Sequence, residues 1–172
     1  NLRAGTAKHL YLPGEHRGIW NREAALSGTE VILCEALLDA LTFRVQGFAN
    51  VTASFGTAGF TREMLAAFIN HKIAEVYIAY DNDEAGNRAA EKLAAQLHGE
   101  GLRAYRVRFP AGEDANSFAL KNDKPDEALL ALLIGAEFMD SVSSGQQPVS
   151  SGQQPVSSGQ QPVASRPSKQ YS

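Results

Sequence analysis

The sequence predicts an α/β fold in which a mainly parallel, four-stranded sheet carries helices on both faces. Short apolar runs alternate along the chain with segments whose apolar residues have helical spacing. Such alternation indicates crossover connections, which place successive strands parallel and cover the sheet with helices. Large apolar side chains become rare after Met139, so the fold is expected to end near that residue.

Strands are expected where apolar residues are consecutive, at residues 31–34, 51–53 and 76–80. Uninterrupted runs of this length are typical of parallel strands that are buried on both faces. A fourth strand is expected at 103–109, where apolar residues alternate with Arg106 and Arg108. This alternation indicates a half-exposed strand at the edge of the sheet.

Helices are expected between the strands and after the last one. Four apolar residues follow the first strand at helical spacing, before Gly47 ends the helix: Leu37, Leu38, Leu41 and Val45. Thr61 is a suitable cap for a second helix. Further helices are expected at residues 85–98 and 126–139.

The charge and the cysteine content exclude several classes of protein. The formal net charge is −3, whereas a domain that grips nucleic acid by bulk electrostatics has an excess of basic residues. Contact with nucleic acid is therefore expected to be local or mediated by a metal ion. Cys34 is the only cysteine, which excludes an internal disulfide and a cysteine-based zinc ribbon in this sequence and fits a reducing cytoplasm. No run is apolar enough to cross a bilayer and no signal-peptide pattern occurs, so no membrane partner is expected.

Three segments are expected along the chain. Residues 1–27 are a basic lead-in, residues 28–140 are the folded domain, and residues 141–172 are a tail. The tail repeats Val-Ser-Ser-Gly-Gln-Gln-Pro at residues 142–148, 149–155 and 156–162. Such a sequence has nothing apolar to bury and cannot offset the entropy of ordering, so the tail is expected to be disordered.

Acidic residues directly follow two of the expected strands. Glu35 comes after the first strand, and Asp81 and Asp83 come after the third. In an open α/β sheet, ligands bind at the carboxyl ends of the strands, near the point where the strand order reverses. These three side chains are therefore expected to lie together at a ligand site.

Three further oxygen donors are expected near that site. Asp39 lies one helical turn after Glu35, on the same side, and Asp114 and Asn116 follow the fourth strand. Carboxylates that are pressed together repel one another and raise their own pKa values unless a cation neutralises them. Mg²⁺ prefers all-oxygen sites and shares its remaining positions with phosphate, so a magnesium site is predicted, with Mn²⁺ as a substitute.

Simpler interpretations remain for single residues. Asp83 also suits a helix N-cap or an Asx turn, and Asp39 also suits the exposed surface of a helix. Cys34 is expected to be a small buried hydrophobe and not a nucleophile, because an apolar strand raises the pKa of a thiol.

Taken together, the motifs resemble the Toprim domain of bacterial DNA primases, which is a Rossmann-like fold. Glu-Ala-Leu-Leu-Asp at 35–39 resembles the Glu-x-x-x-Asp motif at the end of the first Toprim strand, and Ser-Phe-Gly-Thr at 54–57 is similar to the Ser-Leu-Gly-Thr loop after the second. Asp-Asn-Asp-Glu-Ala-Gly at 81–86 resembles the Asp-x-Asp motif, and Gly-Glu-Asp-Ala-Asn at 112–116 resembles the Gly-x-Asp-x-Asp segment. Upstream, Lys-His-Leu-Tyr-Leu-Pro at 8–13 resembles the Lys-Tyr-Leu-x-x-Pro stretch of primase polymerase domains.

The resemblance implies metal-dependent nucleotidyl transfer that makes RNA primers from ribonucleoside triphosphates on single-stranded DNA, with a replicative helicase as a partner, in the cytoplasm at the nucleoid. It implies catalytic roles for Glu35, Asp81 and Asp83, and metal binding by these residues with Asp39, Asp114 and Asn116. Glu35 is either a metal ligand or a general acid or base. Contacts with nucleic acid or nucleotide are implied for Lys8, Arg17, Arg22, Gly56 and Thr57.

Two departures from the family pattern qualify this expectation. Asn116 stands where replicative primases usually carry an aspartate, although phage primase-helicases resemble this sequence there. The zinc-binding module and the amino-terminal half of a primase polymerase domain are not found in the sequence. Primer synthesis by this chain alone is therefore not expected.

Two alternatives stay open. The first is a Toprim nuclease of the overcoming-lysogenization-defect or small-RNA-maturation kind, which hydrolyses phosphodiesters with the same carboxylates. The second is a non-catalytic module that docks DNA or a helicase. The Ser-Phe-Gly-Thr loop and the stretch around Lys8 favour the primase. A topoisomerase is disfavoured because the sequence has no tyrosine nucleophile domain, and a phosphatase because its Asp-x-Asp motif follows the first strand and not the third.

Overall fold

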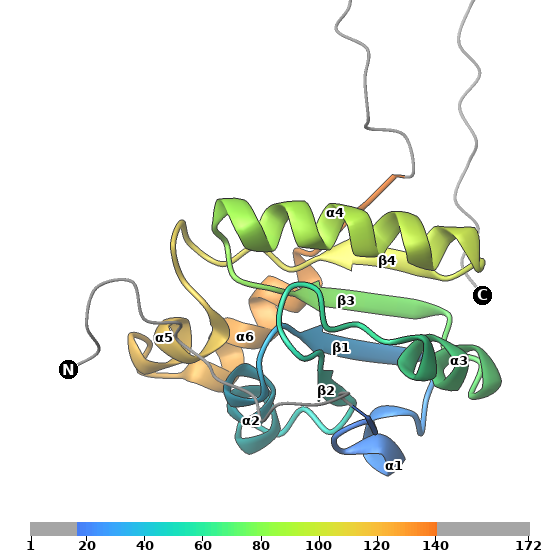
Figure 1. Ribbon diagram of the computed structural model, residues 1–172. Helices are drawn as coiled ribbons and strands as arrows, with labels where there is room; N and C mark the ends of the chain where they lie inside the picture. The colour runs from blue at the N-terminus through green and yellow to red at the C-terminus, as the bar shows by residue number, and fades with distance from the viewer. Residues whose placement is uncertain (1–16, 141–172) are drawn as a thin grey trace, which may run out of the picture. The chain divides into compact units, whose positions relative to one another are not determined.

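The computed structural model describes residues 17–140, which belong to one compact unit (Figure 1). Its sheet has five strands in the order β2-β1-β3-β4-β5. Their bounds are β1 (Glu30–Cys34), β2 (Val51–Ala53), β3 (Glu75–Ala79), β4 (Arg103–Arg106) and β5 (Glu137–Phe138). The first four strands are parallel, and β5 runs antiparallel to β4. Lys8 and the repeat tail lie outside the described residues.

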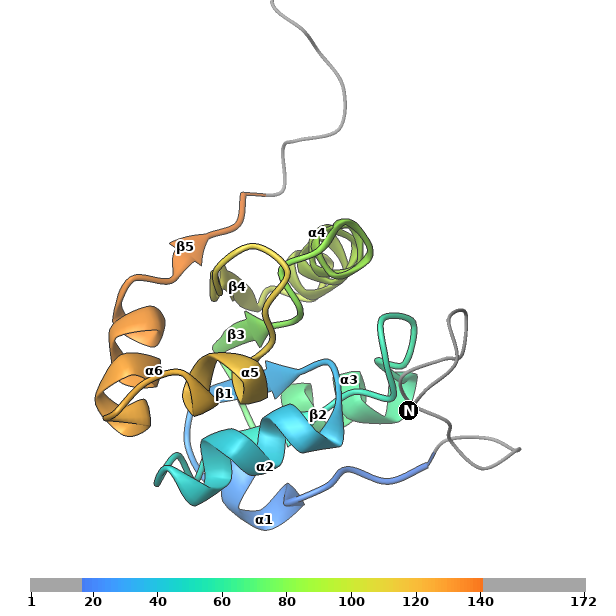
Figure 2. The same ribbon diagram turned by 90° about the vertical axis from the view of Figure 1, so that its left-hand side faces the viewer.

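Helices cover both faces of this sheet (Figure 2). Their bounds are α1 (Arg22–Ala25), α2 (Leu37–Val45), α3 (Arg62–Asn70), α4 (Glu84–Gly99), α5 (Ala115–Leu120) and α6 (Pro125–Ile134). Helices α3 and α4 pack on one face over a core that includes Leu33, Phe68 and Leu93. Helices α2, α5 and α6 pack on the other face over a core that includes Phe43 and Leu129. The predicted α/β class, with a mainly parallel sheet between two helix layers, is therefore confirmed.

Local signals in the sequence explain several element boundaries. Thr61 caps α3 as expected, because its Oγ1 accepts a hydrogen bond from the Met64 amide at 3.2 Å. Helix α4 runs sixteen residues before the chain turns at Gly101, which has a φ of 80°. Within residues 17–140 no helix combines the length and the apolar character needed to span a membrane.

The prediction of four strands was wrong, and so was the edge position of the fourth. The helix expected at 126–139 ends at Ile134, after which Glu137 and Phe138 pair with Arg106 and Tyr105. Gly135 ends the helix, and the short return that follows adds β5 to the sheet. Strand β4 therefore lies between two neighbours, and its alternating sequence does not mark an edge.

The helix expected after the first strand is present as α2, but its apolar stripe does not face the sheet. Leu37, Leu38, Leu41 and Val45 are between 40% and 74% exposed. The buried residues are Asp39, Ala40, Thr42 and Phe43. Helical spacing identifies a face but not which face the sheet covers, and here Phe43 reaches the core from the other side of the helix. This orientation turns Asp39 inward.

Candidate active site

The register of the sheet brings the expected acidic residues to one edge. Cys34, the last residue of β1, pairs with Ala53 of β2 on one side and with Ala79 of β3 on the other. The three strands therefore end level with one another. Glu35 directly follows β1 and Asp81 follows β3 after Tyr80, at the edge where the order β2-β1-β3 shows that the connections change direction.

Glu35 lies near the other carboxylates, and one of its two carboxylate oxygens forms no hydrogen bond within the described residues. Its Oε2 is buried and has no hydrogen-bond partner within the described part of the chain. Burial, together with the charges of Asp81, Asp83 and Asp39, raises the pKa of Glu35 to about 7, and a hydrogen bond from the Asp81 backbone partly opposes this shift. A carboxyl group with this pKa holds and releases a proton near neutral pH.

Asp39 is buried, with 5% of its side chain exposed. Burial raises its pKa to about 7, with contributions from the charges of Asp114 and Asp81. Its Oδ1 accepts a hydrogen bond from the Asn116 amide at 3.3 Å, and the Asn116 Oδ1 accepts one from Thr42 at 3.3 Å. The interpretation of Asp39 as ordinary helix surface is therefore wrong. The structure brings Asn116 to Asp39, across the gap between α5 and α2.

Asp83 and Asp114 both cap helices. The Asp83 Oδ1 accepts a hydrogen bond from the Gly86 amide at 2.7 Å at the start of α4. The Asp114 Oδ1 accepts one from the Ser117 amide at 2.7 Å, in a capping box at the start of α5. The helix-cap interpretation of Asp83 thus describes its geometry. A carboxylate has about four lone-pair sites, so capping does not exhaust its capacity to bind a cation.

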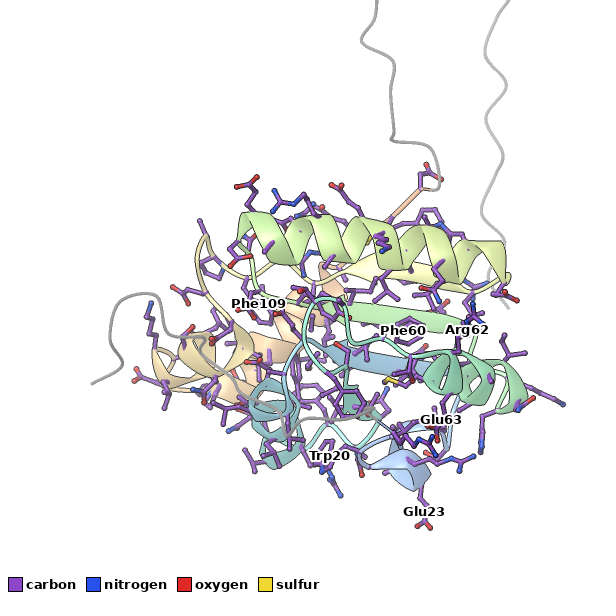
Figure 3. All side chains as sticks on the ribbon, viewed as in Figure 1. Trp20, Glu23, Phe60, Arg62, Glu63 and Phe109 are labelled. Carbon is purple, nitrogen blue, oxygen red and sulfur yellow. The ribbon has the colours of Figure 1, made fainter. Side chains whose placement is uncertain are left out.

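The Asp81-Asn82-Asp83 turn is fixed through its backbone. The Asn82 amide donates to the Glu113 carbonyl at 3.1 Å, and the Gly112 amide donates to the Asn82 carbonyl at 2.9 Å. The Asn82 Nδ2 donates to the Phe109 carbonyl at 2.6 Å. These bonds join the loops after β3 and β4, and Figure 3 shows Phe109 beside them at the end of the sheet.

Gly86 packs its backbone against the same turn. A Cβ atom at this position would lie under 3.0 Å from the Asp81 carbonyl oxygen. The glycine of the Asp-Asn-Asp-Glu-Ala-Gly motif is therefore required because α4 begins directly against Asp81, and no side chain fits between them.

The Ser-Phe-Gly-Thr loop contacts Glu35 from the other side. The Gly56 amide donates to the Glu35 carbonyl at 3.1 Å, and Gly56 has a φ of 90°, which favours glycine. Ser54 is 2% exposed, and its Oγ accepts a hydrogen bond from the Tyr80 hydroxyl at 3.0 Å. The loop thus positions the backbone of Glu35, while the exposed Thr57 faces solvent.

The basic residues expected to contact nucleic acid are not gathered at this edge by the described structure. Arg22 is exposed on α1, and Asn21 at the start of α1 binds the carbonyls of Ala49 and Val51, at the opposite end of β2. Arg17 is exposed and lies next to Gly18, whose amide donates to Glu63 of α3 at 3.0 Å.

The oxygen-only donor set fits a hard divalent cation in its chemistry. Within residues 17–140, no three His, Cys, Asp or Glu side chains are gathered closely enough to hold a metal ion as they stand. The Oε2 of Glu35 is buried without a hydrogen-bond partner in the described residues, and burial raises the pKa values of Glu35 and Asp39, so a cation would stabilise the ionised forms of both carboxylates. Glu35, Asp39, Asp81, Asp83 and Asp114 are therefore suitable ligands that a bound cation would draw together.

Sequence reasoning missed Arg106, which was expected on an exposed face but is 1% exposed. The alternation along β4 predicted that Arg106 faces solvent, whereas the strand lies inside the sheet and is covered by α4. The neighbouring buried residues gave no signal that an arginine would share their environment.

The fold and the candidate site together define an α/β domain with a group of acidic residues at the carboxyl ends of its parallel strands. The Toprim-like family matches residues 32–119, and the chain belongs to this family. The predicted resemblance to the Toprim domain of bacterial primases is confirmed, because the same region aligns with several DNA primases. The DNA primase of Campylobacter jejuni is 34% identical over 94 residues, which cover 55% of this chain and 15% of that protein.

Solved structures agree with this assignment. The zinc-binding and RNA polymerase domains of the Aquifex aeolicus primase are 28% identical with a TM-score of 0.60, and the match covers 70% of this chain and 30% of that one. The RNA polymerase domain of the Mycobacterium tuberculosis primase, in complex with double-stranded DNA, is 25% identical with a TM-score of 0.57 and matches 69% and 39% of the two chains. The chain therefore spans only a small part of the primases that it resembles.

Proposed function

We propose that this chain is the Toprim domain of a DNA primase and supplies the acidic half of a site for nucleotidyl transfer. In this reaction a 3′ hydroxyl attacks the α-phosphate of a ribonucleoside triphosphate, pyrophosphate leaves, and an RNA primer grows on single-stranded DNA. The observation that carries the proposal is that β1 and β3 end level, so that Glu35 and Asp81 come to the same edge of a domain that aligns with primases.

The acidic residues fit distinct roles in this chemistry. Asp81, Asp83 and Asp114, with Asp39 and Asn116, would hold Mg²⁺ or Mn²⁺ through oxygen atoms. Such a cation screens the charge of the triphosphate and stabilises charge that develops during transfer. Glu35, with a pKa of about 7, can hold the proton of the attacking hydroxyl or serve as a further ligand.

The substrates and partners follow from the family and not from the contacts of this chain. We infer single-stranded DNA as the template, ribonucleoside triphosphates as substrates and a replicative helicase as a partner, in the cytoplasm at the nucleoid. The DNA complex of the Mycobacterium tuberculosis primase domain supports contact with DNA. Lys8, Arg17 and Arg22, together with Gly56 and Thr57, are the proposed contacts to nucleic acid or nucleotide.

A primer-synthesis assay tests the proposal. The chain alone, and a longer chain that restores an upstream polymerase region, are incubated with single-stranded DNA, ribonucleotides and Mg²⁺. The longer chain is expected to make short RNA, and Asp81→Ala is expected to abolish the product. Glu91→Ala, which removes an exposed carboxylate from α4 away from the strand ends, is the matched control and is expected to leave synthesis unchanged.

Other outcomes separate the alternatives. Cleavage of DNA without added nucleotides, lost in Asp81→Ala, would identify a Toprim nuclease, because hydrolysis uses the same carboxylates. Absence of both activities, together with absence of metal binding, would leave a module that docks DNA or a helicase and would refute a catalytic role.

A further inference from the structure

Arg106 lies beneath the acidic turn, with its guanidinium group inside the protein. Its Nη1 donates to the carbonyls of Tyr80, Val107 and Ile78 at 2.8, 3.0 and 3.2 Å. Its Nη2 donates to the Asp81 carbonyl and to the Asn87 Oδ1, both at 2.9 Å. One side chain of β4 therefore joins the end of β3, the first residue of the acidic turn and the first turns of α4.

The contacts of Asn87 extend this connection to the middle of the turn. The Asn87 Nδ2 donates to the Asn82 Oδ1 at 3.1 Å, while its Oδ1 receives Arg106. The Asp81 carbonyl thus contacts the guanidinium of Arg106 and also packs against Gly86. A side chain at position 86 would have no room beside this carbonyl. The backbone of the turn is held on both sides, whereas the carboxylates of Asp81 and Asp83 are not partners of Arg106 in any of these bonds.

Fold stability alone is a poor explanation for a buried arginine in this position. All five acceptors are neutral oxygen atoms, and the Nε of Arg106 has no partner within residues 17–140. Burial lowers the pKa of Arg106 to about 10, so the group stays charged at neutral pH. An apolar residue at a buried ionic position is often as stable or more stable. The charges that compensate Arg106 are Asp81, Glu35 and Asp83, the carboxylates of the candidate site.

We propose that Arg106 is a positioning residue for the acidic site. It holds the Asp81 carbonyl and the Asn87 side chain so that Asp81 and Asp83 face a bound divalent cation. This inference rests on the proposed function, because it assigns a role toward the cation that the site would bind. Arg106 would not contact the cation or a substrate; it would act through the shape of the turn.

The guanidinium shape is required for this role. Its two terminal nitrogens reach separate groups of acceptors, one at the end of β3 and one at Asp81 and Asn87. A lysine keeps the charge but places its donors on one atom, so it cannot hold both groups at once. Arg106→Lys therefore removes the positioning of the turn but retains the positive charge of the side chain.

The test measures Mn²⁺ binding by electron paramagnetic resonance on the full 172-residue chain. Arg106→Lys and Asn87→Ala are each expected to weaken binding about 10-fold, as for groups that orient metal ligands. Arg103→Lys is the matched control, because Arg103 lies on the same strand but forms an exposed ion pair with Glu75 at the other end of the sheet. The control is expected to bind Mn²⁺ as the unaltered chain does.

Amide hydrogen exchange without metal provides an independent measurement. Exchange is expected to accelerate at Asn82, Gly86 and Gly112 in both variants, because their amide hydrogen bonds depend on the shape of the turn. Acceleration that is uniform over the protein, with unchanged Mn²⁺ affinity, would show a purely structural role and overturn the proposal. If Arg106→Lys does not fold, Asn87→Ala decides by the same criteria.

The two proposals fail in different ways. Absence of Mn²⁺ binding by the unaltered chain would refute the metal site of the proposed function, and the exchange rates would still decide whether Arg106 holds the turn. Binding by the unaltered chain, with equal affinity in both variants, would refute the role of Arg106 and leave the metal site intact.

Discussion

Replacing Asp39 by asparagine is expected to stabilise the metal-free protein at alkaline pH. Asp39 is 5% exposed, and burial raises its pKa from the ordinary 3.8 to about 7, with help from the charges of Asp114 and Asp81. Asparagine has nearly the same shape and keeps an oxygen that can accept the hydrogen bond from the Asn116 amide. The substitution therefore removes the cost of ionising a buried carboxyl and retains its contact.

The sign and size of the effect follow from proton binding. Between about pH 4 and pH 7 the folded protein binds more protons at Asp39 than the unfolded chain does, so stability falls as the pH rises through this window. At about 1.4 kcal/mol per pKa unit, a rise from 3.8 to about 7 corresponds to at most about 4 kcal/mol. Water penetration and relaxation reduce this cost, so we expect Asp39→Asn to gain roughly 2 kcal/mol at pH 8 and little below pH 4.

Urea unfolding in EDTA, followed by circular dichroism at pH 4, 6 and 8, measures this gain. Asp126→Asn, at an exposed position in the first turn of α6, is the control and is expected to change stability by less than about 0.5 kcal/mol at every pH. If Asp39→Asn is no more stable than the unaltered protein at pH 8, the Asp39 carboxyl is ionised without cost and the raised pKa of Asp39 is refuted.

Three further predictions address the packing and the titration of the same site. Gly86→Ala is expected to cost about 1–3 kcal/mol in urea unfolding, because its Cβ would overlap the Asp81 carbonyl, whereas Gly99→Ala, which meets nothing within 4 Å, is expected to cost nothing. Tyr80→Phe removes the 3.0 Å hydrogen bond to the Ser54 Oγ and is expected to cost about 1 kcal/mol; a neutral effect would show that the buried bond is not needed. Mg²⁺ affinity, measured by calorimetry, is expected to rise between pH 5.5 and pH 8 with release of protons, because Glu35 and Asp39 have pKa values of about 7 and bind the cation in their ionised forms; constant affinity over this range would contradict the raised pKa values.

The sequence predicted that Glu35 and Asp81 come to the same edge of the sheet, because strand ends are encoded locally. Each buried parallel strand is a short apolar run, so the first polar residue after it marks the sheet edge. The level ends of β1, β2 and β3 then follow from the register of the sheet, which brings Glu35 and Asp81 together. The assignment to the Toprim-like family follows from motifs at the same strand ends.

The environment of single residues could not be predicted in this way. The apolar stripe of α2 is longer on its exposed side than on its buried side, and only the packing of Phe43 against the sheet shows that Asp39 faces inward. Strand β5 is two residues long and forms only because the chain returns along β4 after Gly135. No local pattern reports either event, because each depends on contacts between residues far apart in the sequence.

The acidic turn illustrates why side-chain motifs describe this site incompletely. Arg106, Glu113 and Gly112 hold the backbone of Asp81 and Asn82, and the Asn82 side chain adds hydrogen bonds to Phe109 and Asn87. Arg106 thus binds the backbone of Asp81 and not its carboxylate, whereas the Asp83 carboxylate caps α4. If the carboxylates of Asp81 and Asp83 fixed the turn instead, the same oxygen atoms would be needed for folding and for binding. In the proposed metal site, backbone anchoring would separate the two requirements, and residues outside the motif, such as Arg106 and Asn87, would contribute to its affinity.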